Sequence, residues 1–267
     1  MSTISEPGSG SVEPERKWTI EQVLSIRHWT PTLLSFCTTR NPDFHFKPGH
    51  YARLGLGDGH GDDMVWRAYS MVSAADDDTL EFVAVLIPGG AFSEKLAQLK
   101  VGDAIQVDKL SFGFLTVDQL APGKDLWLLS SGTGLGPFVS ILRDPPVWQA
   151  FEKLIVVHSV RRAAELTYRD EMAALSHALS GAKAQLCYIP IVTREPGSSE
   201  FSQRIPQLIS DGRLERAAGT SLSLAESRVM VCGNPEMARE LRQLLSSRGF
   251  ATTRRGVLGQ MAFEKYW

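Results

Sequence analysis

Residues 126–137 read Leu-Trp-Leu-Leu-Ser-Ser-Gly-Thr-Gly-Leu-Gly-Pro, and this stretch decides the class of the second half of the chain. The continuous apolar run Leu126–Leu129 is typical of a parallel strand that is buried on both faces. The glycines after it let the backbone turn tightly and approach a phosphate closely, and Pro137 suits the first position of a helix. The spacing is G-x-G-x-G and not the dinucleotide fingerprint G-x-G-x-x-G, so a plain strand-to-helix turn explains the stretch equally well.

The same rhythm of strand, turn and helix continues towards the C-terminus. We expect strands at 154–160, 185–192 and 229–232, with helices at 166–179 and 235–246. Strands that alternate with helices favour a doubly wound α/β domain around a parallel sheet. We place this domain at residues 125–267, after the turn-forming linker Ala121-Pro122-Gly123-Lys124.

A second strand-to-helix loop, Cys232-Gly233-Asn234-Pro235, is expected at the same carboxyl edge of the sheet. Arg161, Thr193-Arg194 and Arg204 follow strands between the two loops. Guanidinium groups bind phosphate bidentately, so converging arginines would favour the 2′-phosphate of NADP over NAD. From spacing alone, ordinary solvated arginines are the simpler interpretation.

The chain from Trp18 to about Val117 consists of short β-type runs separated by turns. We expect strands at 19–26, 33–38, 51–56, 65–72, 80–87 and 104–107, and one helix at 92–99. Strands at this spacing predict a small antiparallel β-barrel, which we place at residues 17–120. Residues 1–16, rich in Ser, Gly, Pro and Glu, have little to bury and are expected to form a disordered leader.

Two short segments of this barrel could hold a ligand. In Arg67-Ala68-Tyr69-Ser70, alternation along a strand puts Arg67 and Tyr69 on one side, a cation for a phosphate and a ring for a planar heterocycle. From these residues alone, an aromatic side chain in a barrel core is the simpler interpretation. Gly89-Gly90-Ala91-Phe92-Ser93 is either a second phosphate site or a turn that runs into a helix cap.

Composition excludes several classes of protein. A formal net charge of -2 argues against a general nucleic-acid binder. The three widely spaced cysteines, Cys37, Cys187 and Cys232, cannot supply the four thiolates of an iron–sulfur cluster, and they predict neither a disulfide framework nor a metal site. No signal pattern and no apolar run of roughly 20 residues is present, so we expect no membrane span and a cytoplasmic location.

Taken together, these residues resemble the bacterial ferredoxin/flavodoxin–NADP reductases of the ferredoxin–NADP reductase family, over 18–267. In that family R-x-Y-S is the flavin signature, which implies that Tyr69 packs on the isoalloxazine, Ser70 lies near the reactive N5 and Arg67 holds the diphosphate. The resemblance implies an FAD site formed by Arg67, Ala68, Tyr69, Ser70, Val83, Ala84, Val85, Leu86, Ala91, Phe92, Ser93, Thr133, Tyr266 and Trp267.

The resemblance also implies a nucleotide site and a catalytic set. The NADP-binding residues would be Thr133, Gly134, Arg161, Thr193, Arg194, Arg204, Cys232, Gly233, Asn234, Pro235 and Met237. Ser70, Cys232 and Glu264 would be catalytic. The aromatic end of the chain departs from plastid-type members, which end on a tyrosine, so the choice among Phe263, Tyr266 and Trp267 for the ring that lies on the flavin stays open.

The function that this resemblance implies is electron transfer between NADP(H) and ferredoxin or flavodoxin through FAD, with the carrier bound transiently by a monomeric enzyme. FAD suits this task because it accepts a hydride and passes electrons on singly. One alternative is an NAD(P)H-dependent reductase component of an oxygenase, which has the same two domains. Another is a non-catalytic flavin-binding regulatory subunit.

Overall fold

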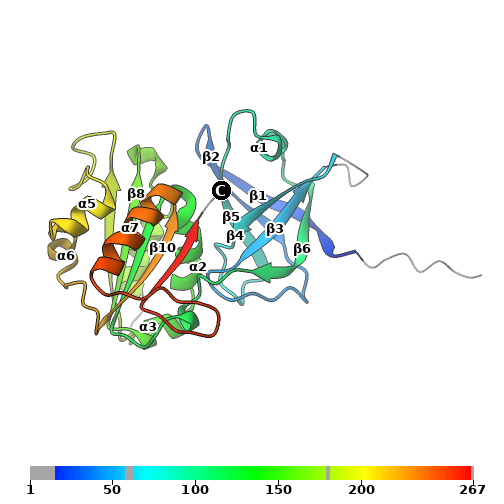
Figure 1. The fold of residues 1–267 in the computed structure, drawn as a ribbon. Helices are drawn as coiled ribbons and strands as arrows, with labels where there is room; N and C mark the ends of the chain where they lie inside the picture. The colour runs from blue at the N-terminus through cyan, green and yellow to red at the C-terminus, as the bar shows by residue number, and fades with distance from the viewer. Residues whose placement is uncertain (1–15, 58–62, 179–180, 266–267) are drawn as a thin grey trace, which may run out of the picture.

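The computed structural model describes residues 16–57, 63–178 and 181–265. Figure 1 shows two units side by side, a barrel of antiparallel strands and a sheet with helices on both of its faces. The predicted fold class, an antiparallel β-barrel followed by a doubly wound α/β unit, is confirmed. Among the described residues, no helix has the length and apolar content that crossing a bilayer requires.

The barrel contains six antiparallel strands in the order β4-β3-β6-β1-β2-β5. An isolated bridge between Met71 and Phe82 joins the two ends of this order and closes the barrel. Its core is a cluster of buried apolar side chains, among them Phe36, Leu54 and Phe82. The strands are β1 (Trp18–Thr30), β2 (Leu33–Thr39), β3 (Tyr51–Leu56), β4 (Val65–Ser70), β5 (Thr79–Val85) and β6 (Ala104–Phe112), and one helix, α1 (Ala91–Leu96), packs against β3 and β4.

The second unit is built on five parallel strands in the order β11-β10-β7-β8-β9. The chain runs from β7 outward to β9, and then returns to the other side of β7 for β10 and β11. The strand order therefore reverses between β7 and β10, which is where open α/β sheets bind their ligands. The strands are β7 (Asp125–Ser131), β8 (Lys153–Val160), β9 (Gln185–Val192), β10 (Ser227–Gly233) and β11 (Met261–Lys265).

The two faces of this sheet have different neighbours. Leu126 and Leu128 point to the face that packs on α2 (Gly136–Leu142), α3 (Pro145–Ala150), α4 (Arg169–Ala178) and the barrel. Trp127 and Leu129 point to the opposite face, which is covered by α5 (Ile205–Ser210), α6 (Arg213–Ala218) and α7 (Pro235–Ser247). Side chains of one parallel strand alternate between two apolar layers, which explains the continuous apolar run in the sequence.

Several element bounds differ from those that we expected. The strand expected at 65–72 ends at Ser70, and the helix expected at 166–179 begins at Arg169, after the short 3₁₀ turn Ala163–Glu165. The glycine loop itself forms a 3₁₀ turn, Gly132–Leu135, so Pro137 occupies the second position of α2. The edge strand β11 was not expected. The boundaries drawn at 120 and 125 stay a prediction.

Candidate functional site

Two strand-to-helix loops lie next to each other where the sheet order reverses. The first links β7 to α2 and the second links β10 to α7. The backbone N–H of Asn234 donates to the Ser131 hydroxyl at 2.9 Å, which ties the second loop to the first. The Asn234 side chain also caps α7, because its Oδ1 accepts from the N–H groups of Glu236 (2.9 Å) and Met237 (3.1 Å).

Glycine allows these loops to touch. A Cβ at Gly134 would lie 2.4 Å from the carbonyl oxygen of Cys232, and a Cβ at Gly233 would lie 2.4 Å from the Ser131 hydroxyl. Gly233 also has a φ of +126°, a conformation that other residues rarely adopt. Gly132 differs, since none of the described neighbouring atoms lies within 4 Å of the Cβ position there, and its backbone is open to a ligand.

A buried histidine that is not among the individually predicted site residues supports the first loop. His158, on β8, donates from Nε2 to the carbonyl oxygen of Gly132 at 3.0 Å, and its Nδ1 lies 3.5 Å from the Tyr188 hydroxyl. Burial lowers the pKa of His158 to about 4, so the ring is neutral at physiological pH. The available sequence signal was a histidine in an otherwise apolar strand next to the glycine loop.

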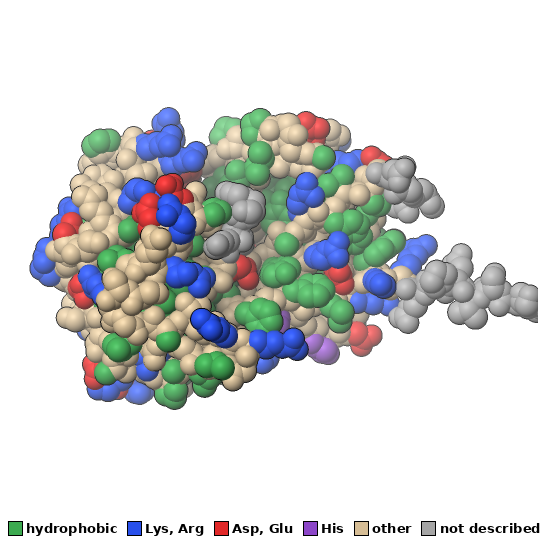
Figure 2. Space-filling model, viewed as in Figure 1, with side chains coloured by type: hydrophobic (Ala, Val, Ile, Leu, Met, Phe, Trp, Pro, Cys, Tyr) green, Lys and Arg blue, Asp and Glu red, His purple; other side chains and the backbone are tan. Residues whose placement is uncertain are grey.

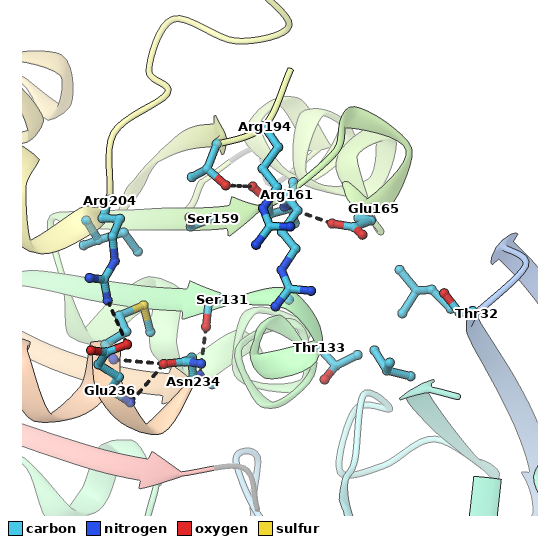
Figure 3. Close-up of a pocket in the computed structure, with 18 of the residues that line it drawn as sticks. Thr32, Ser131, Thr133, Ser159, Arg161, Glu165, Arg194, Arg204, Asn234 and Glu236 are labelled. Carbon is cyan, nitrogen blue, oxygen red and sulfur yellow. Dashed lines mark hydrogen bonds and ion pairs between the residues drawn. The ribbon is translucent and has the colours of Figure 1, made fainter. Parts of the chain in front are cut away.

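A cavity of about 700 Å³ opens above the two loops and is bounded on its far side by the barrel. Thr32 of the barrel lines it opposite Ser131 and Thr133 (Figure 3), and Leu33 also lines it. Nine of the predicted site residues also line it: Val85, Thr133, Arg161, Thr193, Arg194, Arg204, Gly233, Asn234 and Met237. Gly134, Cys232 and Pro235 belong to the loops but do not line this cavity.

The three candidate arginines are in different electrostatic surroundings. Figure 3 shows the guanidinium groups of Arg161 and Arg194 turned towards the cavity, and within the described structure neither forms an ion pair. Their loops are tied together, because the N–H of Arg194 donates to the carbonyl oxygen of Arg161 at 2.9 Å. Arg204 pairs with Glu240 at 3.1 Å and with Glu236 at 3.9 Å, so its charge is already balanced.

The predicted catalytic residues meet on the barrel-facing side of the sheet. The Ser70 hydroxyl, at the end of β4, donates to Oε1 of Glu264 on β11 at 3.1 Å, although the two residues are 194 positions apart. Cys232 on β10 pairs in register with Glu264 on β11, so both side chains lie on the same face of the sheet. Burial raises the pKa of Glu264 to about 7, against the opposing effect of the Ser70 hydrogen bond.

The R-x-Y-S strand also contributes one ring of an aromatic pair in the barrel domain. The Tyr69 and Phe92 ring centroids lie 5.4 Å apart. Burial raises the pKa of Tyr69 to about 12, so its phenol stays neutral. Arg67 is exposed, and its Nη1 donates to the Trp66 carbonyl at 2.8 Å. Its remaining N–H groups could hold a phosphate.

The other predicted flavin contacts differ in what their side chains do. Ala84 points into the barrel core, so only its backbone could face a ligand, whereas Val83 packs in the layer between the two units. The Ser93 hydroxyl accepts from the N–H of Ile87 at 3.0 Å and stabilises the turn before α1. Leu86 packs against the barrel core, and Ala91 is the first residue of α1.

The C-terminal strand narrows the choice of the ring that covers the flavin. Phe263 packs with the residues on the α7 side of the sheet, and the Arg242 guanidinium lies 4.1 Å from the centre of its ring. This is the face opposite to Glu264 and Ser70, so Phe263 is removed from the three candidates. Tyr266 and Trp267 lie outside the described residues.

Comparisons with known proteins agree on one family. The model of the oxidoreductase FAD-binding domain matches residues 20–109, and that of the oxidoreductase NAD-binding domain matches residues 128–243. The chain is 39% identical to a ferredoxin–NADP reductase of Pseudomonas aeruginosa (92% of this chain, 96% of the relative). It is 37% identical to a flavodoxin/ferredoxin–NADP reductase of Escherichia coli (94% and 99%).

A solved structure shows the same likeness in three dimensions. The ferredoxin NADP+ reductase of Neisseria gonorrhoeae, crystallised with bound FAD and NADP, superposes with a TM-score of 0.88 at 38% identity. The match covers 95% of this chain and 100% of that one. With both domain models matched in order and the relatives covered almost end to end, this chain belongs to the ferredoxin–NADP reductase family.

Proposed function

We propose that this protein is a flavoenzyme that transfers electrons between NADP(H) and a one-electron carrier, ferredoxin or flavodoxin, through bound FAD. The observation that carries the proposal is the hydrogen bond between Ser70 and Glu264, from opposite units, in a chain whose two units also enclose a cavity where the sheet order reverses. FAD supplies the chemistry, since it takes up the two electrons of a hydride and releases them one at a time.

The residues present fit both nucleotides. For FAD, the barrel offers the Tyr69 ring, the exposed Arg67 cation and the backbone of β5. For NADP(H), the open backbone at Gly132 lies on one side of the cavity, with Arg161 and Arg194 on another. A fork of N–H donors suits a 2′-phosphate, and an unpaired guanidinium is available without first breaking an ion pair.

The chain's own residues then have distinct tasks. Arg161 and Arg194 bind the adenosine 2′-phosphate, and the Gly132–Leu135 turn supports the middle of the nucleotide. Thr133, buried at this turn, lies where the nucleotide domain faces Val85 of the barrel. The loop at Cys232–Gly233 limits how deeply the nicotinamide end of the nucleotide can enter between the units. It does so because this loop and the Gly132–Leu135 turn already touch each other and leave no space between them.

Ser70 and Glu264 handle protons at the reacting edge. A carboxyl with a pKa of about 7 holds a proton at roughly half occupancy near neutral pH, which suits general acid–base exchange. The Ser70 hydroxyl, 3.1 Å from Glu264, can pass a proton because it is both a donor and an acceptor. Exchange through this pair supplies or removes the proton that accompanies electron transfer.

The carrier protein docks transiently, and reduction of that carrier is the direct test of the proposal. The FAD-loaded protein is mixed with NADPH, catalytic ferredoxin or flavodoxin, and cytochrome c as the final one-electron acceptor. We expect cytochrome c reduction that depends on the carrier and is much slower with NADH. Carrier-independent reduction, or equal rates with the two nucleotides, would instead support an oxygenase reductase component.

A further inference from the structure

A cluster of polar side chains joins the two units on the far side of α2 from the glycine loop. Arg143, at the C-terminal end of α2, donates from Nη1 to Glu81 Oε2 on β5 at 2.7 Å and to the Val72 carbonyl at 3.0 Å. The Tyr168 hydroxyl donates to the other oxygen of Glu81 at 2.9 Å. Both oxygens of this barrel carboxylate are therefore bound by the nucleotide domain. We call Arg143, Glu81, Tyr168 and Ser140 the domain clamp.

The clamp binds the segment that leaves the flavin strand. The Ser140 hydroxyl, also on α2 and fully buried, donates to the carbonyl oxygen of Ser73 at 2.7 Å. Ser73 and the Val72 carbonyl held by Arg143 come directly after Ser70 and Met71. Two consecutive carbonyl groups just beyond Ser70 are thus fixed by one helix of the other unit.

The opposite end of that helix carries the nucleotide loop. α2 begins at Gly136, immediately after the Gly132–Leu135 turn, and a Cβ at Gly136 would lie 3.1 Å from Val83 of the barrel. A helix of this length is rigid, so a shift of its C-terminal end relative to the barrel displaces Thr133 as well. One short element therefore sets the separation between the nicotinamide loop and Ser70.

Tyr168 adds a second attachment through an unusual backbone conformation. Among the described residues it is the one non-glycine with a positive φ, at 56°, just before α4. Its ring lies 5.3 Å from that of Trp29 on the barrel strand β1, with its hydroxyl on Glu81. A left-handed tyrosine persists where its surroundings hold it in place, and here those surroundings belong to the barrel.

Arg143 also has a partner within its own unit. Its Nε and Nη2 donate to the two oxygens of Glu171 on α4 at 2.7 and 2.9 Å, a bidentate pair that fixes the plane of the guanidinium. The Arg143 and Glu81 side chains are 22% and 18% exposed, so solvent and salt screen their attraction less than that of a surface pair. The two pairs of Arg143 can therefore be separated experimentally: Glu81 lies across the domain boundary and Glu171 does not.

We propose that the domain clamp is a positioning device, which holds the NADP(H)-binding loop at reacting distance from the flavin edge marked by Ser70. This inference rests on the proposed function. It assigns these residues no contact with either nucleotide. Because a displacement of about 1 Å can cost roughly 100-fold in rate, loosening the clamp slows hydride transfer. Nucleotide affinity stays unchanged, since Arg161 and Arg194 lie within one unit.

The test compares Glu81→Gln, which weakens the contact across the boundary, with Glu171→Gln, which weakens the contact within the nucleotide domain. Three quantities are measured on the FAD-loaded proteins: the stopped-flow rate of flavin reduction by NADPH, the long-wavelength charge-transfer absorbance with NADP+, and the dissociation constant of adenosine 2′,5′-bisphosphate. The last probe contains only the adenosine half of the nucleotide, and it therefore reports on the nucleotide domain alone.

We expect Glu81→Gln to lower the reduction rate roughly 10- to 100-fold and to weaken the charge-transfer band, with bisphosphate affinity within twofold of wild type. Glu171→Gln should change the rate and the band much less, because Glu81 and the Val72 carbonyl still bind Arg143 across the boundary. Equal rates in wild type and Glu81→Gln, or equal losses in both variants, would overturn the clamp. If Glu81→Gln does not fold, Tyr168→Phe takes its place with the same criteria. A wild-type protein that NADPH does not reduce would count against the proposed function itself.

Discussion

At the scale of single residues, Glu264 has the most unusual chemistry in the site. Its carboxyl is largely removed from water between the units, and within the described part of the chain it receives one hydrogen bond, from Ser70. Removal from water disfavours the charged form more than this single donor favours it, so the pKa rises from its ordinary value of 4.5 to about 7. An acid of this strength can give up and regain its proton at neutral pH.

This pKa predicts a pH dependence that Glu264→Gln removes. Turnover with NADPH should fall as pH rises through about 7, because the proton held by Glu264 is lost there. The variant should be slower at pH 6 and should have a flat profile between pH 6 and 8. A profile of kcat against pH for both proteins checks this, and an inflection that survives in the variant would assign it to another group.

The raised pKa of Glu264 also makes the free energy of unfolding depend on pH, in a direction that can be predicted. Between pH 4.5 and about 7 the folded state holds a proton on Glu264 that the unfolded state has lost. The contribution of this group to the free energy of unfolding is therefore present below pH 4.5 and decreases as pH rises through about 7, by up to about 3 kcal/mol. Glu264→Gln should gain stability relative to wild type over this window.

Arg194 and Arg204 are predicted to differ in their effect on the choice of nucleotide. Arg194→Ala should raise the KM for NADPH roughly 10- to 100-fold, since a charged hydrogen bond to the 2′-phosphate is lost, and should leave NADH turnover nearly unchanged. Arg204→Ala should have a smaller effect, because Glu240 and Glu236 already balance its charge. Steady-state kinetics with both nucleotides check this. An equal loss with NADH would contradict a role in binding the 2′-phosphate.

At the scale of elements, the important feature is the contact between the β7–α2 and β10–α7 loops. The two loops belong to segments about 100 positions apart, yet no side chain separates Gly134 from Cys232 or Gly233 from Ser131. This contact brings two helix N-termini to one point of the sheet. Any atom added between the loops must push them apart.

Gly233→Ala tests this contact against a matched control, Gly219→Ala. Both glycines have positive φ, so each substitution strains the backbone: by about 1–2 kcal/mol at Gly219, which is in the left-handed helical region, and by more at Gly233, whose φ of +126° lies beyond it. At Gly233 a clash with Ser131 adds about 1–3 kcal/mol, whereas none of the described neighbours lies within 4 Å of the Cβ position at Gly219. The melting temperature and the rate of NADPH oxidation should both fall more in Gly233→Ala than in Gly219→Ala. Equal effects would mean that the loop contact is unimportant.

Local patterns predicted most of these elements. Strands at 51–56 and 185–192 were expected with the bounds that the structure shows, because turn residues or a change of periodicity mark both of their ends. The pairing of Arg67 and Tyr69 on one side of β4 also follows from alternation alone. The glycine loops were found from composition, although their spacing could not show that they touch each other.

The remaining features depend on contacts that are distant in the sequence. β11 has only five residues, and it is a strand because β10 is beside it, which no local pattern records. The side of the sheet that Phe263 occupies follows from the same register. His158 appeared to be part of an apolar strand until its hydrogen bond to Gly132 was visible. The balanced charge of Arg204 comes from α7, some 30 positions away.

At the scale of the whole molecule, electrons need an entry and an exit that do not overlap. The cavity in which we propose that NADP(H) binds is lined by Arg161 and Arg194. Gly113 lies near Glu264, because a Cβ at Gly113 would lie 3.4 Å from Oε2 of the carboxyl, and the next residue, Phe114, is 64% exposed. Residues 251–259 contact the segment that follows Phe114 in the chain, since the Thr253 hydroxyl donates to the Gln119 carbonyl at 2.6 Å.

We expect the carrier protein to dock on the surface formed by residues 251–259. The turn at Arg254–Val257, with Leu258 after it, exposes two arginines and two apolar side chains, Val257 and Leu258. Figure 2 shows Lys and Arg side chains beside hydrophobic ones along the lower part of the junction between the two units. Arg255→Glu should raise the KM for an acidic carrier protein roughly tenfold at low ionic strength, and reduction of a small neutral quinone should not change. Arg216→Glu makes the same charge change on α6, on the opposite face of the sheet, and should have no effect. Equal effects of the two variants would exclude docking at this turn.

The central claim is that the junction of the two units holds FAD within reach of NADPH, and anaerobic rapid mixing tests it most directly. The FAD-loaded protein is mixed with NADPH, and in parallel with NADH, while the flavin absorbance is followed. We expect rapid bleaching by NADPH, about tenfold or more faster than by NADH at equal concentration. Protein that does not take up FAD, or bound FAD that NADPH fails to bleach, would contradict the account.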